Sequence, residues 1–298
     1  MFNPQHLSTT FNALAKIGFY SNSLVSCLCT ASRRPDVLSS FNGHAIANIL
    51  NSLAVLSHLD RGLVTALCGA FLTRLSSSDG KNRGDTTPEP QQLANCLHAC
   101  VVLGHFDRQW FEAMLRHVEA IRIEDWSGEA LSQLYLVNLS LDVECKQWGL
   151  RLPDRVFTAA SATDKRHKAR VVSSNLHLQV SAALTRLGLP HVNEGDKGGL
   201  SVDIVLGERE SDEEGWGGVV ERKKVVIEVD GPRHFLTGGD AGSKRTHGFF
   251  HKKQRLLEKQ GFTVLHVPFF EWNEVQVWHP GVDKEKAQEM YLEELLQS

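Results

Sequence analysis

The chain has 298 residues, of which 42% are hydrophobic and 22% are charged. This composition excludes a chain that is disordered throughout, and no apolar run approaches the roughly 18 residues of a membrane-spanning helix, so we expect no membrane partner. The net charge of -3 excludes a general attraction to nucleic acid, so any such binding must come from local basic clusters.

Four segments of the first half align with one another position by position. They begin, about 40 residues apart, at Asn3, Asn42, Glu89 and Ser127. Apolar residues recur in them at helical spacing, as in Leu7, Phe11 and Leu14, and each segment is followed by a second helical run. We therefore expect residues 1–150 to form an α-solenoid of helical hairpins.

The helix pattern of this region carries a first family resemblance. The runs from Pro4 to Gly18 and from Pro90 to Gly104 resemble the octotricopeptide repeats of organellar RNA-binding proteins. The resemblance implies that the array follows single-stranded RNA with one or two side chains per repeat. A solenoid that binds protein is the alternative, because Leu- and Ala-rich hairpins are common.

All six cysteines lie in the first half, and none has the paired CxxC spacing of a zinc site. We expect small buried thiols of a helical core. A metal bound by Cys96 and Cys100, which would share one helix face, is the alternative. The sequence thus predicts no cofactor for the protein, unless the second half holds the Mg²⁺ or Mn²⁺ considered below.

The second half changes its period after a basic segment at 151–172, which we expect to be a linker. Helical patterns cover 173–189, 248–260 and 285–297, and strand patterns cover 199–207, 223–230 and 262–270. This order predicts a small mixed sheet with flanking helices over 173–298. The expected fold class is α plus α/β.

Three stretches of this half closely resemble a RAP domain, with a core motif over 225–296. They are "IEVDGPRHF" at 227–235, "KKQRLLEKQGFTVLHVPFFEW" at 252–272 and "YLEELL" at 291–296. The resemblance implies a fold related to restriction endonucleases of the PD-(D/E)xK type. Repeats followed by a RAP domain are also a recurring arrangement in organellar RNA-processing factors.

The nuclease relationship implies a site at the strand ends. In such enzymes two carboxylates hold Mg²⁺ or Mn²⁺, and a lysine two residues later supports the developing charge. Asp203 and Glu228 match the carboxylates, whereas Asp230 stands where the lysine would be. The candidate metal ligands are therefore Asp203, Glu228 and Asp230, and the positive group would have to come from His234, Lys252 or Lys253.

A purely structural interpretation of the two carboxylates on this strand stays open. One of Glu228 and Asp230 can cap the following turn while the other pairs with Arg233 or Arg255. His266 is expected to be an ordinary partly buried or surface histidine.

Basic residues around the RAP motif are candidates for phosphate contact. They are Arg233, His234, Lys244, Arg245, Lys252, Lys253 and Arg255. A solvated helix face is the alternative interpretation.

Together these patterns predict an organellar RNA-binding protein that acts in RNA processing, stability or ribosomal RNA maturation. Its partners would be single-stranded messenger or ribosomal RNA of a mitochondrion or chloroplast. A metal-dependent endonuclease and a scaffold associated with ribosomal or other ribonucleoprotein proteins are the alternatives. No transit peptide is visible before Asn3, so the organellar location rests on the family resemblance.

Overall fold

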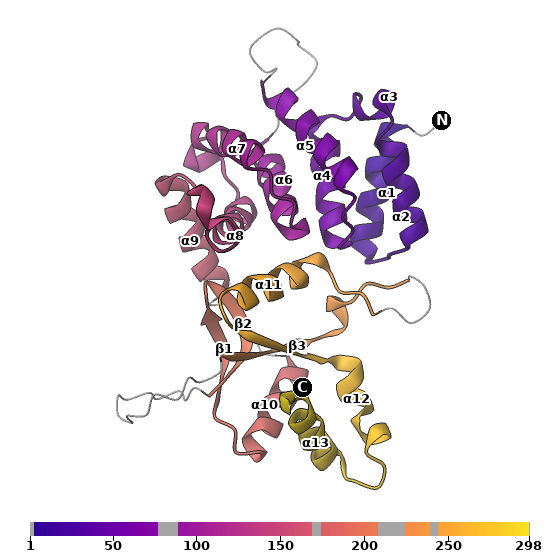
Figure 1. The fold of residues 1–298 in the computed structure, drawn as a ribbon, viewed down its shortest axis with the longest axis vertical. Helices are drawn as coiled ribbons and strands as arrows, with labels where there is room; N and C mark the ends of the chain where they lie inside the picture. The colour runs from indigo at the N-terminus through magenta and orange to yellow at the C-terminus, as the bar shows by residue number, and fades with distance from the viewer. Residues whose placement is uncertain (1–2, 77–88, 169–173, 208–223, 239–243, 298) are drawn as a thin grey trace. The chain divides into compact units, whose positions relative to one another are not determined.

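The computed structural model describes residues 3–76, 89–168, 174–207, 224–238 and 244–297 (Figure 1). The chain divides into two compact units. The helical unit consists of residues 1–167 together with 235–252, and the sheet unit consists of 168–234 together with 253–298. Each unit is described by itself.

The helical unit confirms the expected hairpins. Its elements are α1 (Pro4–Ile17), α2 (Asn22–Ser32), α3 (Pro35–Leu38), α4 (Gly43–Val55), α5 (Arg61–Ser76), α6 (Pro90–Leu103), α7 (Arg108–Ala120), α8 (Gly128–Glu144) and α9 (Asp154–Lys168), with short 3₁₀ turns at Ile123–Asp125 and Lys146–Trp148. The first helices of the hairpins, α1, α4, α6 and α8, pack against one another in that order and form one layer. Helix α9 occupies most of the segment expected to be a linker.

Local chemistry fixes where the repeat helices begin. Asn3, Asn42 and Ser127 each accept a hydrogen bond from a backbone N–H group of the first turn. These caps satisfy donors that would otherwise lack a partner at the helix start.

The ends of three repeat helices share a left-handed residue. Gly18 and Gly104 have φ angles of 65° just after α1 and α6. Ser57 takes the same place after α4 with a φ of 51°, although its side chain disfavours this conformation. The repeat geometry therefore overrides the residue type at Ser57.

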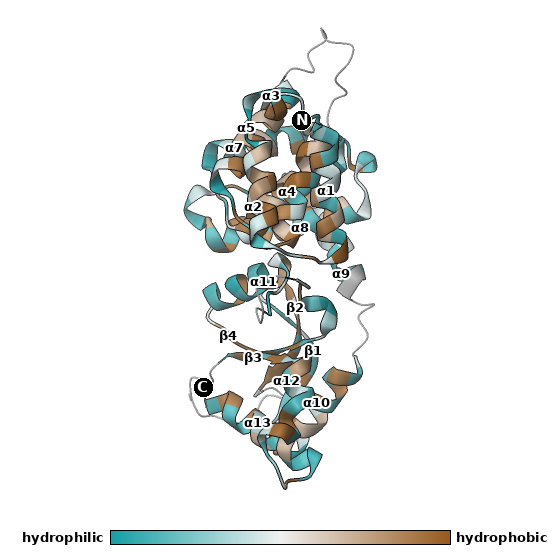
Figure 2. Ribbon diagram, turned by 90° about the vertical axis from the view of Figure 1, so that its right-hand side faces the viewer, coloured by the Kyte–Doolittle hydropathy of each residue, from teal (hydrophilic) through white to brown (hydrophobic). Residues whose placement is uncertain are grey.

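Hydrophobic side chains from the helices of the hairpins form the core of this unit. The ribbon of these helices in Figure 2 is brown where the residues are hydrophobic. Phe11, Ile46, Leu50 and Phe111 are completely buried. Five of the six cysteines are buried and all six are free, in agreement with the expected core thiols.

Residues 235–252 belong to the helical unit although they lie within the RAP-like motif. Thr237 pairs with the first hairpin, because its amide donates to Gly18 O over 2.6 Å and its carbonyl accepts from the Tyr20 amide over 2.8 Å. Arg245 donates from Nε to Leu56 O over 3.2 Å and from Nη2 to Ser57 O, and its guanidinium lies 4.1 Å from the centre of the Tyr20 ring. This segment therefore packs against the C-terminal ends of α1 and α4 and forms hydrogen bonds with the backbone there.

The sheet unit contains a four-stranded mixed sheet. Its elements are α10 (Asn175–Arg186), β1 (His191–Lys197), β2 (Leu200–Leu206), β3 (Val225–Asp230), a 3₁₀ turn at Pro232–His234, the second part of α11 (Gly248–Lys259), β4 (Thr263–Pro268), α12 (Phe269–Trp278) and α13 (Lys284–Gln297). The strand order is β1-β2-β3-β4, in which only β3 and β4 are parallel. The expected α plus α/β fold class is confirmed.

One face of the sheet carries the core of this unit. Ile204, Ile227 and Val267 of the strands pack against hydrophobic residues of α10, α12 and α13. Trp272 of α12 is one of these residues and is fully buried. Because side chains alternate along a strand, the neighbours Asp203, Glu228 and His266 lie on the opposite face.

Two elements of the sheet unit differ from the sequence expectation. The strand pattern at 262–270 ends at Pro268, and Phe269 already begins α12. Strand β1 has no apolar alternation in its sequence "HVNEGDK" and is paired on one side only, so the period-two signal of a half-buried strand is missing.

Among the described residues, no helix has both the length and the apolar character needed to cross a membrane.

Candidate functional site

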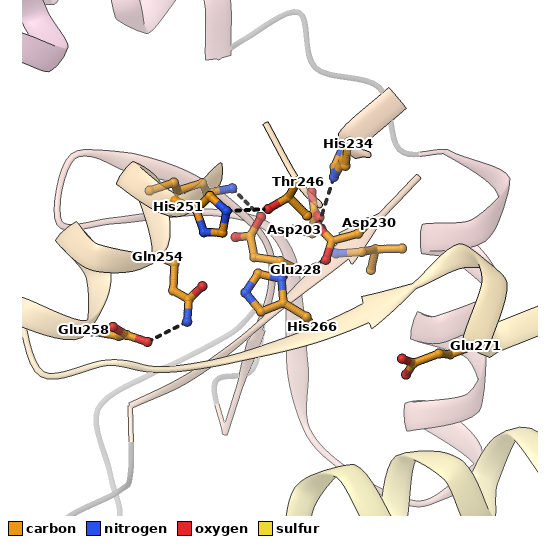
Figure 3. A network of polar contacts seen from close by, with 12 residues as sticks. Asp203, Glu228, Asp230, His234, Thr246, His251, Gln254, Glu258, His266 and Glu271 are labelled. Carbon is orange, nitrogen blue, oxygen red and sulfur yellow. Dashed lines mark hydrogen bonds and ion pairs between the residues drawn. The ribbon is translucent and has the colours of Figure 1, made fainter. Parts of the chain in front are cut away.

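The ends of β2, β3 and β4 bring carboxylates and histidines together. Ile204 pairs with Ile227 and Val205 with Val226, so the antiparallel register places Asp203 opposite Glu228. On the other side of β3, Glu228 is the register partner of His266. We call these carboxylates and histidines, together with Lys253, the carboxylate–histidine cluster. Figure 3 labels its members Asp203, Glu228, Asp230, His234 and His266.

Glu228 is a buried carboxylate with one cationic partner. Only 4% of its surface is exposed, and the Lys253 ammonium donates to Oε2. Its Oε1 atom is buried and has no hydrogen-bond partner among the described residues. Burial raises the pKa of Glu228 to about 7, an effect that Lys253 opposes and the charges of Asp203 and Asp230 reinforce. Near neutral pH this residue therefore exchanges between its ionised and neutral forms.

Asp230 lies between two imidazoles. Its Oδ1 atom is 2.9 Å from Nδ1 of His234, and its Oδ2 atom is 2.8 Å from Nδ1 of His266. Burial acts to raise the pKa of Asp230, but the hydrogen bonds from the two histidines outweigh it and the pKa is lowered. Burial acts to lower the pKa of His266, but Asp230 outweighs it and raises this pKa. Asp230 thus holds its negative charge and favours the protonated form of His266.

The structure brings the sequence-predicted carboxylates onto one surface but gives them different neighbours. Asp203 accepts the Val229 amide on Oδ2 over 2.7 Å, while Glu228 contacts Lys253. Of the three basic groups considered for the place of the nuclease lysine, Lys253 is the one that contacts Glu228, whereas His234 contacts Asp230. His266, which we expected to be an ordinary histidine, is part of the cluster because the parallel register of β4 sets it beside Glu228.

The remaining basic candidates have different surroundings. Lys252 is only 3% exposed, and its Nζ atom lies 3.1 Å from Nε2 of the buried His98 in the helical unit. Arg245 is engaged by the ends of α1 and α4, as described above. In contrast, Arg233 and Lys244 are exposed and Arg255 is half-buried.

A second surface with possible binding chemistry lies on the first-helix layer of the helical unit. Aligned from their caps, the repeats place Thr9, Asn48, Asn95 and Gln133 at one helix position. The position four residues earlier holds Gln5, His44, Gln91 and Glu129. Residues four apart lie on one helix face, so these two positions form a polar row across the layer. Every one of the eight side chains is polar and none is buried.

Hydrogen bonds connect neighbouring members of this polar row. Gln91 Nε2 lies 3.0 Å from both Asn95 Oδ1 and Gln133 Oε1, and the second bond joins α6 to α8. In α4, Asn48 Nδ2 lies 2.9 Å from His44 Nε2. The row was not recognised from the sequence, although comparing the aligned repeats at matching polar positions, and not only at apolar ones, would have revealed it.

A hollow of about 400 Å³ extends the polar row between the starts of α1 and α4. Gln5 and His44 of the row line it together with the cap residues Asn3 and Asn42. The two helix starts surround this hollow with hydrogen-bonding groups.

The fold and these surfaces define the class of the protein: a helical-repeat array joined to a small mixed α/β domain that carries clustered carboxylates and histidines. Comparison with known proteins specifies the second part. Residues 227–295 match the family model described as "RAP domain". The chain therefore carries a RAP domain in its C-terminal region.

One curated relative extends the similarity beyond this domain. It is named "RAP domain-containing protein, chloroplastic" and comes from Oryza sativa subsp. japonica. It is 24% identical over 307 residues, and the alignment covers 92% of this chain and 44% of the relative. The similarity thus includes the helical unit, and the chain spans less than half the length of the rice protein.

Proposed function

We propose that this protein binds single-stranded RNA in an organelle and acts in RNA processing, stability or ribosomal RNA maturation. The observation that carries the proposal is the polar row, defined by Gln5, His44, Gln91, Glu129, Thr9, Asn48, Asn95 and Gln133. Its members recur at matching positions of consecutive repeats, which is how helical repeats present one recognition unit per repeat.

The chemistry of the row suits unpaired bases. A side-chain amide offers a donor and an acceptor side by side, and the exposed edge of an unstacked base offers the complementary pair. Within the row, Gln91, Asn95 and Gln133 are held by their mutual hydrogen bonds, so little side-chain freedom is lost on binding. We assign base contact to these side chains.

The RAP domain contributes positive charge in this proposal. Arg233 and Lys244 are exposed, and Arg255 is half-buried, so we assign phosphate contact to these three residues. Lys252 contacts the buried His98 and Arg245 binds the ends of α1 and α4, so neither residue is assigned to phosphate contact. We place the protein in an organelle because the rice relative is named chloroplastic and the repeats resemble those of organellar proteins.

Binding of labelled single-stranded RNA across a salt series tests the proposal. We expect the affinity to fall steeply with salt, and the double substitution Gln91→Ala and Gln133→Ala to weaken binding by about tenfold or more. Gln109→Ala is the matched control, because this exposed glutamine lies on α7, outside the first-helix layer. Weak binding that is independent of salt would contradict the proposal and support a protein scaffold.

Cleavage of RNA is a second candidate function, favoured by the contact between Lys253 and Glu228. It sets a positive group beside the carboxylates of β2 and β3, as nuclease chemistry requires. The buried Oε1 atom of Glu228 fits a cation ligand, so Asp203 and Glu228 would hold Mg²⁺ or Mn²⁺, which would supply an activated water. The same incubation, analysed on a denaturing gel, tests whether the protein cleaves RNA. Cleavage that depends on this site must disappear when a chelator removes the ion and in the Glu228→Gln variant. Intact RNA in the presence of either ion would exclude this function.

A further inference from the structure

Three potential metal ligands converge beside the carboxylate–histidine cluster. His177 comes from the first turn of α10, Glu194 from β1 and Asp203 from β2. One ligand atom from each residue lies within 4.8 Å of those from the other two. His177 is buried, with 2% of its surface exposed. The sequence patterns indicated Asp203 as a metal ligand, but neither they nor the family comparisons indicated His177 or Glu194.

A chain of hydrogen bonds decides which nitrogen of a neutral His177 carries the proton. It starts at Leu189 O, which can only accept, so the His191 Nδ1 atom at 2.9 Å carries a proton. When His191 carries only this proton, its Nε2 atom accepts from the Ser181 hydroxyl at 2.8 Å. Ser181 Oγ has given its proton and therefore accepts from Asn193 Nδ2 at 3.0 Å.

The last link of this chain reaches the buried imidazole. Asn193 turns Oδ1 toward Nε2 of His177 over 3.0 Å, so Nε2 must donate. In neutral His177 the Nδ1 atom then carries a lone pair. This atom lies 3.2 Å from Glu194 Oε1, and so two electron-rich atoms face each other.

The backbone of β1 is shaped to give this arrangement. Consecutive strand residues normally point to opposite faces, but Asn193 and Glu194 both reach His177. Glu194 has a φ of 53°, which interrupts the alternation at this residue. The Val229 amide orients Asp203 from the other side by donating to Oδ2.

We propose that His177 Nδ1, Glu194 and Asp203 bind a divalent first-row transition-metal ion such as Mn²⁺ or Zn²⁺. A cation between the facing lone pairs replaces their repulsion with two bonds, and its charge matches the two carboxylates. One imidazole nitrogen with two carboxylates suits these ions better than Mg²⁺ or Ca²⁺, which prefer oxygen ligands throughout. Asn193 does not bind the ion. It accepts a hydrogen bond from His177 Nε2 and so holds the ligating histidine in the required tautomer.

This site stands apart from the proposed RNA binding and is tested without RNA. The full chain is titrated with Mn²⁺ and followed by electron paramagnetic resonance, because Mn²⁺ has little affinity for the cysteine thiols. We expect one tightly bound ion whose spectrum shows coupling to an imidazole nitrogen, and we expect Zn²⁺ to displace it. The melting temperature should rise when the ion is bound.

Both this site and the nuclease-like pair of Asp203 and Glu228 contain Asp203, so the substitutions that separate them are made at residues that only this site uses. Glu194→Gln should weaken Mn²⁺ binding by about 10–100-fold, and Ser181→Ala should weaken it through loss of the fixed tautomer, by roughly tenfold. Glu271→Gln, a carboxylate on α12 that contacts Tyr291, is the matched control and should leave binding unchanged.

Two results would overturn the proposal. One is a folded wild-type chain that binds no Mn²⁺ with nitrogen coupling. The other is equal binding by wild type and Glu194→Gln. Either would mean that His177 is an imidazolium paired with Glu194. Circular dichroism of each variant establishes that it is folded, and Ser181→Ala, which alters no proposed ligand, serves if His177 or Glu194 variants do not fold.

Discussion

The Nζ atom of Lys252 lies 3.1 Å from Nε2 of His98, and both side chains are buried in the helical unit. An ammonium can only donate, so this contact requires a neutral His98 that accepts on Nε2. Burial, aided by the charge of Lys252, lowers the pKa of His98 well below its usual value of 6.5.

Acid should therefore destabilise the helical unit through His98. Its pKa is lower in the folded chain, so the unfolded chain binds the extra proton as the pH falls below 6.5, and stability is lost in that direction. The slope is at most about 1.4 kcal/mol per pH unit for one group. We expect His98→Gln, which keeps an acceptor but does not titrate, to flatten the fall in urea-unfolding free energy between pH 7 and pH 5. An unchanged slope in this variant would rule out His98 as the source.

The titration of His266 should depend on Asp230. The carboxylate raises the pKa of His266 above 6.5, so Asp230→Asn should lower it, because the amide carries no charge. Imidazole signals followed by NMR across pH measure this directly. Glu271→Gln on α12 is the control and should leave the His266 signal in place. The stability from this pair is present below pH 6.5 and is lost as the pH rises through the raised pKa.

Arg245→Ala should destabilise the helical unit by about 2 kcal/mol, because it removes charged hydrogen bonds to Leu56 O and Ser57 O and the contact with the Tyr20 ring. The neighbouring Lys244 is exposed, so Lys244→Ala should change the unfolding free energy little. Urea denaturation of the two variants compares them. Equal effects would show that Arg245 does not hold the ends of α1 and α4.

Two glycines should respond oppositely to alanine. A Cβ atom at Gly248 would lie 2.1 Å from Ala54 O, so Gly248→Ala should cost about 1–3 kcal/mol by overpacking. A Cβ atom at Gly69 in α5 meets nothing within 4 Å, so Gly69→Ala should stabilise that helix by about 0.5–1 kcal/mol. The melting temperature of each variant, compared with that of the wild type, shows whether the substitution stabilises or destabilises the chain. A neutral Gly248→Ala would contradict the close approach of α11 to the end of α4.

The left-handed helix ends provide a second pair of opposite substitutions. Ser57→Gly should stabilise the chain by about 1 kcal/mol, because glycine takes a φ of 51° without strain. Gly18→Ala, at the matching place after α1, should destabilise it by about the same amount. Melting temperatures that move in the same direction would show that the two ends are not equivalent.

The sequence by itself predicted the hairpin repeat and most of the RAP domain's strands and helices. These features depend on local chemistry: the spacing of apolar residues along the helix, the first-turn donors that Asn3 and Asn42 satisfy, and the alternation in β3 that puts Glu228 and Asp230 on one face. Strand β1 was not predicted because an edge strand without apolar alternation carries no such signal.

Only the tertiary structure decided the partners of the polar groups. Lys252 and Lys253 are adjacent, yet successive residues of a helix point about 100° apart, so Lys252 contacts His98 and Lys253 contacts Glu228. These partners lie 154 and 25 residues away along the chain. The same holds for Asp230 and His266, because the register of β3 and β4, which no local pattern encodes, brings them within hydrogen-bond distance. It also holds for the proposed metal ligands His177, Glu194 and Asp203, which three different elements bring together.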